Sequence, residues 1–432
     1  MLKTFCLLFI ASLLQSAAFA QTSNSILSQK AIPFDDKSEL SELADLITQQ
    51  RLVLLGEASH GTSEFYTKRA FLSRHLIEEQ DFNFIAVEGD WASFSRINEF
   101  VKHIESGPAT LEEAMESFTR WPPWMWKNQE FKNLVEWLHQ FNANLPMSDR
   151  VGLYGIDVYD HEAAMVDVTT WISSVDSAKG RESAGLYSCM SRHNEPVDYL
   201  RMIAQTGQDC SEDISDVLEI VRSLEHHPDS DPWSFFKAEQ GAKVALNAEL
   251  HYRSNLYQGS QSWNHRASHF YLTAERLLGY YGEGSRGVIW AHNTHIGDAR
   301  ATDMAIHSMH NIGQLSREAL GAENVFAIGF GTYTGRVLAG SSWGDEMQAM
   351  TTPEAQPDTW EYTLEQTGHP RFFLDLRDEE LASALSERIP HRAIGVTYDP
   401  SNEQNNYVPT VLPQRYDAFI FIRDTDVLSP LD

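Results

Sequence analysis

The chain runs Leu52-Val53-Leu54-Leu55-Gly56-Glu57-Ala58-Ser59-His60-Gly61-Thr62 early in its length, an apolar stretch followed directly by a polar turn. Consecutive apolar residues ended by glycine are typical of a strand that is buried on both faces of a parallel sheet. In the next segment, 62–80, Phe65, Leu72 and Leu76 fall on one face at spacings of seven and four, which predicts an amphipathic helix. This order of strand, polar turn and helix predicts an α/β fold.

Similar apolar runs, each ended by a polar or glycine-containing turn, recur along the chain. They are Phe84–Val87, Val151–Ile156, Gly287–Trp290, Val325–Ile328, Phe372–Leu376, Ala393–Val396 and Ala418–Ile422. Helical patterns separate them, so we expect a mostly parallel central sheet with helices on both faces.

The strand pattern disappears between about residues 161 and 282. Long helical patterns replace it, broken at Pro228-Asp229-Ser230-Asp231-Pro232, and they predict a helical insertion or subdomain. The expected organisation is a signal peptide at 1–20 and one α/β domain at 21–432 that contains this insertion.

The first twenty residues have the pattern of a secretory signal peptide. Lys3 precedes an apolar run from Phe5 to Leu14, and Ala18-Phe19-Ala20 fits a cleavage site. The run is shorter than the roughly 20 residues that span a bilayer, and no later segment reaches that length. We therefore expect a secreted or periplasmic protein, cleaved near Ala20, with no membrane span.

Charge and cysteine content narrow the function classes further. The formal net charge of −28 disfavours binding to nucleic acid, because an acidic surface repels phosphate. After cleavage only Cys189 and Cys210 remain. An oxidising compartment permits a disulfide between them, but spacing alone leaves the pairing open. We assign neither cysteine to catalysis.

Ionisable residues follow four of the expected strands. Because the carboxyl ends of parallel strands share one edge, where open α/β sheets bind ligands, these residues are expected in one crevice. They are Glu57 and His60, Glu88 and Asp90, Asp157, and His292 and His295. Taken singly, each residue can be explained by a favourable interaction with a helix dipole or by a hydrogen bond to loop backbone. Their expected convergence at one edge of the sheet favours a functional site instead.

Arg69 lies on the apolar stripe of the helix at 62–80. A buried guanidinium keeps its charge and needs a carboxylate partner, for which Glu57 and Glu88 are the candidates. Arg69 can therefore serve as a stabilising ion pair or as a clamp for a carbonyl or oxyanion.

Two further interpretations remain open. His292 and His295 are three residues apart, as are Glu57 and His60, a spacing that suits metal ligands, although no H-E-x-x-H motif occurs. Metal dependence is therefore an alternative, and no cofactor is expected. The segment Arg120-Trp121-Pro122-Pro123-Trp124-Met125-Trp126 supplies aromatic side chains for a bulky ligand or for the core.

Several motifs together resemble the erythromycin esterase family. In chain order they are Gly56–Thr62, Val87–Trp91, Trp124–Trp126, Tyr154–Asp157, Ser262–Arg266, Trp290–Asp298, Gly329–Tyr333 and Gln414–Ala418. The resemblance implies hydrolysis of the macrolactone ester of macrolide antibiotics without a metal. One departure is Ala267, where family members often have Asp. A secretion signal is another, which separates this chain from the intracellular resistance enzymes.

Carried over by position, the resemblance implies that His60 is the general base that activates water. It places Glu57, Arg69, Glu88, His292 and His295 in the same polar cleft. We expect substrate contacts from Asp90, Trp91, Trp124, Trp126, Asp157 and Arg266.

The hypothesis from sequence is therefore a secreted hydrolase of a small-molecule ester, above all a macrocyclic lactone. The chain contains no G-x-S-x-G motif, which disfavours a serine nucleophile. The alternatives are a metal-dependent hydrolase of another substrate and a non-catalytic protein that binds a bulky ligand.

Overall fold

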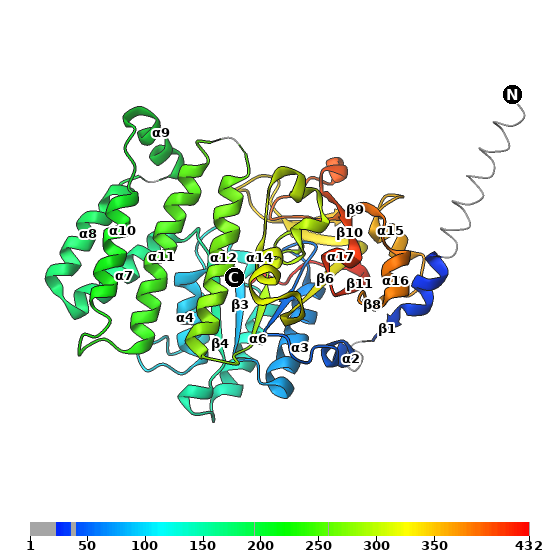
Figure 1. The fold of residues 1–432 in the computed structure, drawn as a ribbon, viewed down its shortest axis with the longest axis horizontal. Coiled ribbons are helices and arrows are strands. Elements are labelled where there is room, and N and C mark those ends of the chain that lie inside the picture. Colours follow the sequence, from blue (N-terminus) through cyan, green and yellow to red (C-terminus); the bar gives the residue numbers. More distant parts are fainter. Residues whose placement is uncertain (1–22, 36–39, 194, 258, 432) are drawn as a thin grey trace, which may run out of the picture.

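The computed structural model describes the chain apart from residues 1–22, 36–39, 194, 258 and 432. The expected signal peptide, 1–20, lies outside the described residues. A nine-stranded sheet forms the centre of the described part (Figure 1). Its strands are β1 (Ile32–Pro33), β2 (Leu52–Leu55), β3 (Phe84–Asp90), β4 (Gly152–Asp157), β5 (Gly287–Trp290), β6 (Val325–Ala339), β7 (Gln348–Thr352), β8 (Arg371–Asp375) and β11 (Ala418–Thr425).

The strand order confirms the predicted fold class. The path is β1-β8-β11-β6-β2-β5-β3-β4, with β7 paired to β6. All neighbours from β11 to β4 run parallel, whereas β1, β7 and β8 pair antiparallel. Trp290 of β5 lies opposite both Leu55 of β2 and Val87 of β3. These central strands therefore end at one level, and the residues that follow them emerge at the same edge.

Both faces of the sheet are covered, as the continuous apolar strands predict. Val53 and Leu55 belong to one buried cluster, and Leu52 and Leu54 belong to another, because successive side chains of a strand point to opposite faces. Helices that contribute to the first cluster are α2 (Leu40–Asp45), α3 (Ser63–Gln80), α4 (Trp91–Val101), α5 (Leu111–Met115) and α6 (Gln129–Asn142). The second cluster includes α14 (Ile312–Leu320), α15 (Trp360–Glu365) and α16 (Glu379–Ala384).

The strand predicted at Ala393–Val396 is wrong. Ile394 makes only an isolated bridge to Ser59, and its N–H donates to the Ala58 carbonyl at 2.8 Å. The strand ends just before it, as β9 (Arg388–Arg392), which pairs with β10 (Tyr407–Val411) outside the central sheet. Ile394 is buried because it packs against the turn after β2, whereas the other residues of the run are partly exposed.

The region from residue 161 to 282 is helical, and Figure 1 shows most of it stacked at one end of the molecule. Its helices are α7 (His161–Val175), α8 (Ser177–Ser191), α9 (Pro196–Thr206), α10 (Ser211–Ser223), α11 (Pro232–Ser254) and α12 (Gln261–Tyr281). Helices α7, α8, α10 and α11 enclose a hydrophobic cluster of their own, and α12, which packs beside α11, contributes its buried apolar residues to the second cluster on the sheet. None of the helices in the described ranges has both the length and the hydropathy required to cross a bilayer.

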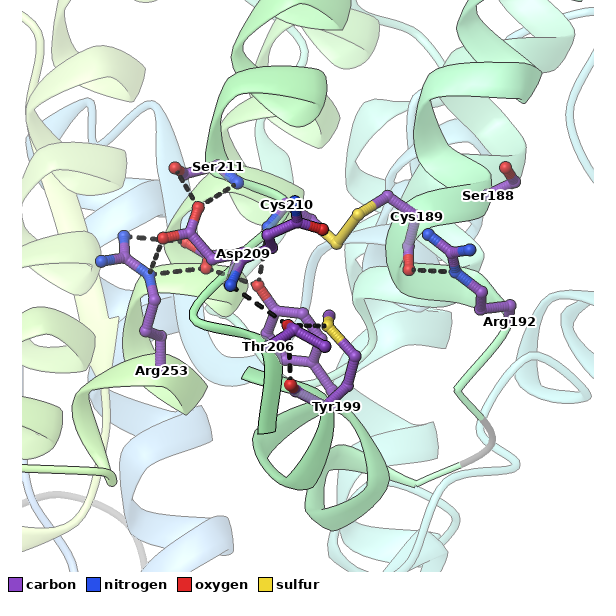
Figure 2. The surroundings of a disulfide bond; sticks show 12 residues. Ser188, Cys189, Arg192, Tyr199, Thr206, Asp209, Cys210, Ser211 and Arg253 are labelled. Carbon is purple, nitrogen blue, oxygen red and sulfur yellow. Dashed lines mark hydrogen bonds and ion pairs between the residues drawn. A yellow bond between two sulfur atoms is a disulfide. The ribbon is translucent and has the colours of Figure 1, made fainter. Parts of the chain in front are cut away.

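A disulfide joins Cys189 of α8 to Cys210, the residue before α10 (Figure 2). The structure thus shows that the two cysteines are paired, which their spacing in the sequence left open. Beside it, Tyr199 donates to Glu249 Oε1 at 2.7 Å and accepts the Cys210 N–H at 3.0 Å. The bond and this polar contact hold the start of α10 against α8, α9 and α11, which stabilises the helical region.

Candidate functional site

A cleft of about 430 Å³ opens at the carboxyl edge of the sheet, where β3, β4 and β5 end. We call it the polar cleft. Its lining includes seven charged or imidazole side chains predicted from sequence together with aromatic and apolar groups. The lining residues are His60, Glu88, Asp90, Phe118, Arg120, Pro122, Pro123, Met125, Trp126, Asp157, Tyr159, Arg266, His292, Thr294, His295, Trp343, Ala393, Gly395, Val396, Thr397 and Val408.

The turn after β2 brings Glu57 and His60 together. Two glycines permit its tight path: a Cβ on Gly56 would lie 2.1 Å from Asn293 Oδ1, and one on Gly61 would lie 1.9 Å from the Leu338 carbonyl oxygen. His60 Nδ1 is 2.8 Å from Glu57 Oε1, and both side chains are buried. The carboxylate accepts a hydrogen bond from the Nδ1–H, so in the neutral ring Nε2 carries no proton, and none of the described residues forms a hydrogen bond with it.

Arg69 lies behind this pair. Its Nη2 donates to Glu57 Oε2 at 2.6 Å, and its guanidinium lies over the rings of Tyr66 and Trp290 at 4.4 and 4.6 Å. Arg69 is 0% exposed and does not line the polar cleft. Of the two roles considered for Arg69, this placement favours the ion pair, and the partner is Glu57 rather than Glu88.

Glu88 organises the opposite side of the cleft. Its Oε2 accepts the backbone N–H of His292 at 2.9 Å. Its Oε1 lies 2.9 Å from Arg266 Nη2 and 3.2 Å from His295 Nε2. One carboxylate therefore anchors the loop after β5 and a residue of α12, and the ring of Trp263 stacks on His295 at 4.6 Å.

Two arginine–carboxylate pairs form a further wall. Arg266 binds Asp157 through Nε and Nη2 at 2.9 and 2.6 Å. Arg120 binds Asp90 through Nε and Nη2 at 2.7 and 2.9 Å. Both guanidinium groups also lie over the ring of Tyr159, at 4.7 and 5.1 Å. Because bidentate pairs of this kind have a fixed geometry, the wall is preorganised.

Burial and neighbouring charges separate the pKa values of the cleft residues. Burial lowers the pKa of His60, but the hydrogen bond and charge of Glu57 outweigh it, so this pKa is raised above its usual value. Burial raises the pKa of Glu88, yet the positive charges of His295, His60 and Arg266 hold it well below its usual range. Burial and the nearby His60 place the pKa of His292 well below its usual value. At neutral pH His292 is therefore uncharged and Glu88 is ionised.

The hydrogen bonds of His292 define its tautomer. Its Nδ1 accepts the backbone N–H of Thr294 at 3.3 Å and lies 2.8 Å from the Thr294 hydroxyl. A backbone N–H can only donate, so in the neutral ring the proton is on Nε2. The Ala58 carbonyl acts on the His292 ring as a backbone hydrogen-bond acceptor and raises its pKa slightly, although Nε2 makes no hydrogen bond of standard geometry with the described residues. The His292 N–H is therefore buried beside the Ala58 carbonyl, and the ring centre of His292 is 5.0 Å from that of His60.

The structure brings together most of the predicted site residues. His60, Glu88, Asp90, Trp126, Asp157, Arg266, His292 and His295 line the polar cleft, and Glu57 and Arg69 lie directly behind His60.

Trp91 and Trp124, expected as substrate contacts, lie in the core and not in the lining of the polar cleft. Trp91 is not among the lining residues: it begins α4, stacks on Tyr154 at 6.0 Å and belongs to the core on one face of the sheet. Trp124 belongs to the core on the other face. Both are large apolar groups next to polar strand ends, and the sequence does not show which way such a side chain points.

Sequence reasoning missed Arg120, Tyr159 and Trp343 as cleft residues. Tyr159 follows the strand-end Asp157 by two residues, and Arg120 is the first residue of the aromatic segment. Their closeness in sequence to predicted site residues was a weak indication that they line the cleft. Trp343 comes from a loop after β6 and is 65% exposed at the cleft. No pattern around it distinguishes it from a surface residue.

Within the described ranges, no group of three or more His, Cys, Asp or Glu side chains is arranged to hold a metal ion. Ser59, the neighbour of His60, directs its hydroxyl to Thr62 Oγ1. The chemistry available in the cleft is therefore that of an acid–base imidazole, its carboxylate, a neutral N–H donor and two paired arginines.

The sequence model of the erythromycin esterase family matches residues 77–425, which is most of the chain. The chain belongs to the erythromycin esterase family. The match includes Glu88, Asp157, Arg266, His292 and His295 and begins after the turn that carries Glu57 and His60.

Individual esterases of known name are distant relatives. Erythromycin esterase type I of Escherichia coli is 30% identical over 99 residues, which is 23% of this chain and 23% of that protein. Type II of Escherichia coli is 29% identical over 126 residues, 29% of this chain and 28% of that protein. The matched stretch thus spans less than a third of either relative.

Three solved structures share the fold over nearly all of the chain. A Bacillus cereus protein has a TM-score of 0.80 at 18% identity, covering 96% of this chain and 99% of that one. A succinoglycan biosynthesis protein has a TM-score of 0.79 at 20% identity, covering 95% and 98%. A mutant of the erythromycin esterase EreC in its open conformation has a TM-score of 0.65 at 18% identity, covering 92% and 97%.

Proposed function

We propose that this protein hydrolyses a small-molecule ester, above all a macrocyclic lactone, by direct attack of a water molecule that His60 activates. The observation that carries the proposal is the buried Glu57–His60 pair at the edge of a cleft that His292 also lines, with the two imidazole rings 5.0 Å apart. A base with a second imidazole beside it suits acyl transfer to water.

The proposed reaction begins with a water molecule bound at His60 Nε2. As the water oxygen bonds to the ester carbonyl carbon, its proton passes to Nε2, and Glu57 stabilises the resulting imidazolium. The negative charge moves to the carbonyl oxygen, which accepts the His292 N–H. Collapse of the intermediate breaks the carbon–oxygen ester bond, and the leaving alkoxide takes the proton back from His60. No covalent enzyme intermediate is required.

The remaining cleft residues hold these groups in place or contact the substrate. Glu88 positions the backbone of His292, and Arg266 and Arg120 keep the carboxylates of Asp157 and Asp90 paired. Trp126, Tyr159, Phe118 and Trp343 offer apolar surface to the body of the substrate. Family membership supports an ester of the macrolide type, and a volume of about 430 Å³ lies within the range of small-molecule sites.

We also propose that the protein is exported, as its N-terminal sequence indicates. The Cys189–Cys210 disulfide supports this location, because such bonds persist in oxidising compartments. Mass spectrometry of the secreted chain tests it, with a mature N-terminus at Gln21 expected. A protein that retains Met1 in the cytoplasm would overturn it.

Mass spectrometry of macrolides and simpler lactones incubated with the protein tests the activity. We expect one substrate class to gain the mass of one water. The variant His60→Asn should lose about 10²–10⁴-fold in turnover while remaining folded. The matched control is His75→Asn, whose histidine lies on α3 outside the cleft and faces Asp45. Near-normal turnover of His60→Asn would reject His60 as the base, and no mass change across the panel would reject esterase activity.

A further inference from the structure

A second and larger cavity lies at the opposite edge of the sheet from the polar cleft. Its volume is about 1060 Å³, and it shares no lining residue with the cleft. Lys102, which lines it, directly follows α4, whereas Trp91 at the other end of α4 directly follows Asp90 of the cleft. An 11-residue helix is about 16 Å long, so the two sites are separated by about the length of α4. We call the second one the Lys102 cavity.

Aromatic side chains form much of the wall of the Lys102 cavity. Trp171 comes from α7, Trp233 from α11, and Tyr280 and Tyr281 from the end of α12 (Figure 1). Tyr281 is held by the Tyr154 hydroxyl at 2.9 Å and stacks on Phe84 at 5.6 Å. The indole N–H groups of both tryptophans are buried and have no hydrogen-bond partner in the described part of the chain. The aromatic part of the wall is therefore preformed, and it stands beside polar and charged lining residues.

Lys102 is a buried cation without a carboxylate. It is 7% exposed, its Nζ is 3.4 Å from the Tyr281 hydroxyl and 5.2 Å from the centre of that ring, and no described carboxylate oxygen lies within 4 Å. Arg150, which donates to the Lys102 carbonyl at 2.5 Å, adds positive charge. Burial, with a smaller effect of Arg150, lowers the pKa of Lys102 to about 8.

Three of the four acidic residues that line the cavity are engaged elsewhere, and the fourth, Glu105, is exposed and makes no ion pair with Lys102. Lys237 Nζ lies 2.8 Å from Glu99 and 3.9 Å from Asp167. Asp231 accepts the N–H groups of Trp233 and Ser234 at the start of α11. In a chain with 61 acidic and 33 basic residues, a buried lysine left unpaired is unexpected, because burial of an unpaired charge is costly. An anionic group inside the cavity would supply the missing partner.

We propose that the Lys102 cavity binds an amphiphilic molecule with a flat apolar or aromatic body and one anionic group, which pairs with Lys102. The aromatic wall accepts the body, and the cation accepts the carboxylate, sulfonate or phosphate at its end. This site is separate from the proposed esterase reaction and does not depend on it.

The test uses two fluorescent probes with similar bodies. 8-Anilino-1-naphthalenesulfonate carries an anion, and N-phenyl-1-naphthylamine does not. We expect the sulfonate to bind once per chain, and Lys102→Met to weaken it by about tenfold or more, since charge-assisted hydrogen bonds are strong. Lys102→Arg should restore most of the affinity. The control Lys179→Met removes a lysine of α8 that bonds Ser223 outside the cavity, and it should change nothing. The uncharged probe should be insensitive to all three.

A second measurement needs no variant. Trinitrobenzenesulfonate labels lysine amines, and peptide mass spectrometry reads the rate at each position. Saturating anilinonaphthalenesulfonate should slow labelling of Lys102 several-fold and leave Lys179 unaffected. Equal affinity of the sulfonate for the native chain and Lys102→Met, or labelling of Lys102 that ignores the probe, would overturn the proposal.

Discussion

Replacement of Glu57 by Gln tests the centre of the proposed mechanism. In the native chain Glu57 serves two partners, with Oε1 on His60 Nδ1 at 2.8 Å and Oε2 on Arg69 Nη2 at 2.6 Å. An amide has only one oxygen, so Gln can accept from one partner only. Arg69 is fully buried and keeps its charge, so it takes the oxygen. The amide NH2 then faces His60 Nδ1, which must accept, and the proton moves to Nε2.

This tautomer cannot take a proton from water at Nε2. Turnover of Glu57→Gln should therefore fall by about the full general-base contribution, 10²–10⁴-fold. Removal of the charge also leaves burial as the main influence on His60, so the pKa of His60, raised in the native chain, should fall below 6.5. The folded state should lose about 3 kcal/mol, because a buried guanidinium loses its ionic partner.

The assays are turnover of the ester identified above, an NMR titration of the His60 ring, and urea unfolding. The NMR titration and the unfolding do not require a substrate. The matched control is Glu78→Gln on α3, where the carboxylate binds Trp137 Nε1 at an exposed position and the same charge is removed. If Glu57→Gln kept native turnover together with an unchanged His60 titration, the assignment of the pair as carboxylate and base would be wrong.

His292→Ala should lower kcat by about 10²–10³-fold with little change in KM, because the donor acts on charge that develops in the transition state; an equal rise in KM alone would contradict this. Arg266→Met leaves Glu88 and Asp157 without their shared cation and should reduce the free energy of unfolding by about 3–5 kcal/mol in urea titrations, and an unchanged midpoint would refute that loss. The free energy of unfolding, measured against pH, should include the full stabilisation from protonated His60 below pH 6.5 and lose it as pH rises through the raised pKa of the folded state. Glu57→Gln should not show this loss. Replacement of Cys189 and Cys210 by Ser opens a loop with a sequence separation of 21 and should remove about 3 kcal/mol, measured by thermal melting against the native chain.

The local sequence was enough to predict the sheet and the edge that carries the chemistry. A strand buried on both faces must be apolar throughout, so Leu52–Leu55 and Gly287–Trp290 were recognisable without any contact information. Parallel strands end at one edge, which placed His60, Glu88, Asp157 and His292 together. The partner of Arg69 was narrowed to two carboxylates by the same reasoning.

The errors have a common cause. Ala393–Val396 was predicted as a strand, but only Ile394 of it is buried, and Trp91 and Trp124, expected to contact a substrate, belong to the core. Hydrophobicity records that a residue leaves water and does not record against which part of the fold it packs. The buried turn at Ile394 and the core position of Trp91 depend on segments distant in the chain.

Composition and periodicity act over a few residues, and they determined the fold class, the helical region and the set of ionisable groups at the strand ends. Distances between segments depend on the packing of the whole chain. Only the tertiary structure therefore decided that Glu57 rather than Glu88 supports His60, that Thr294 places the His292 proton on Nε2, and that Cys189 meets Cys210. The same packing buries Lys102 beside a cavity with aromatic walls, where no carboxylate of the described residues lies within ion-pair distance of it. No local sequence pattern shows that Lys102 has no carboxylate partner, because this depends on all the segments that pack around its side chain.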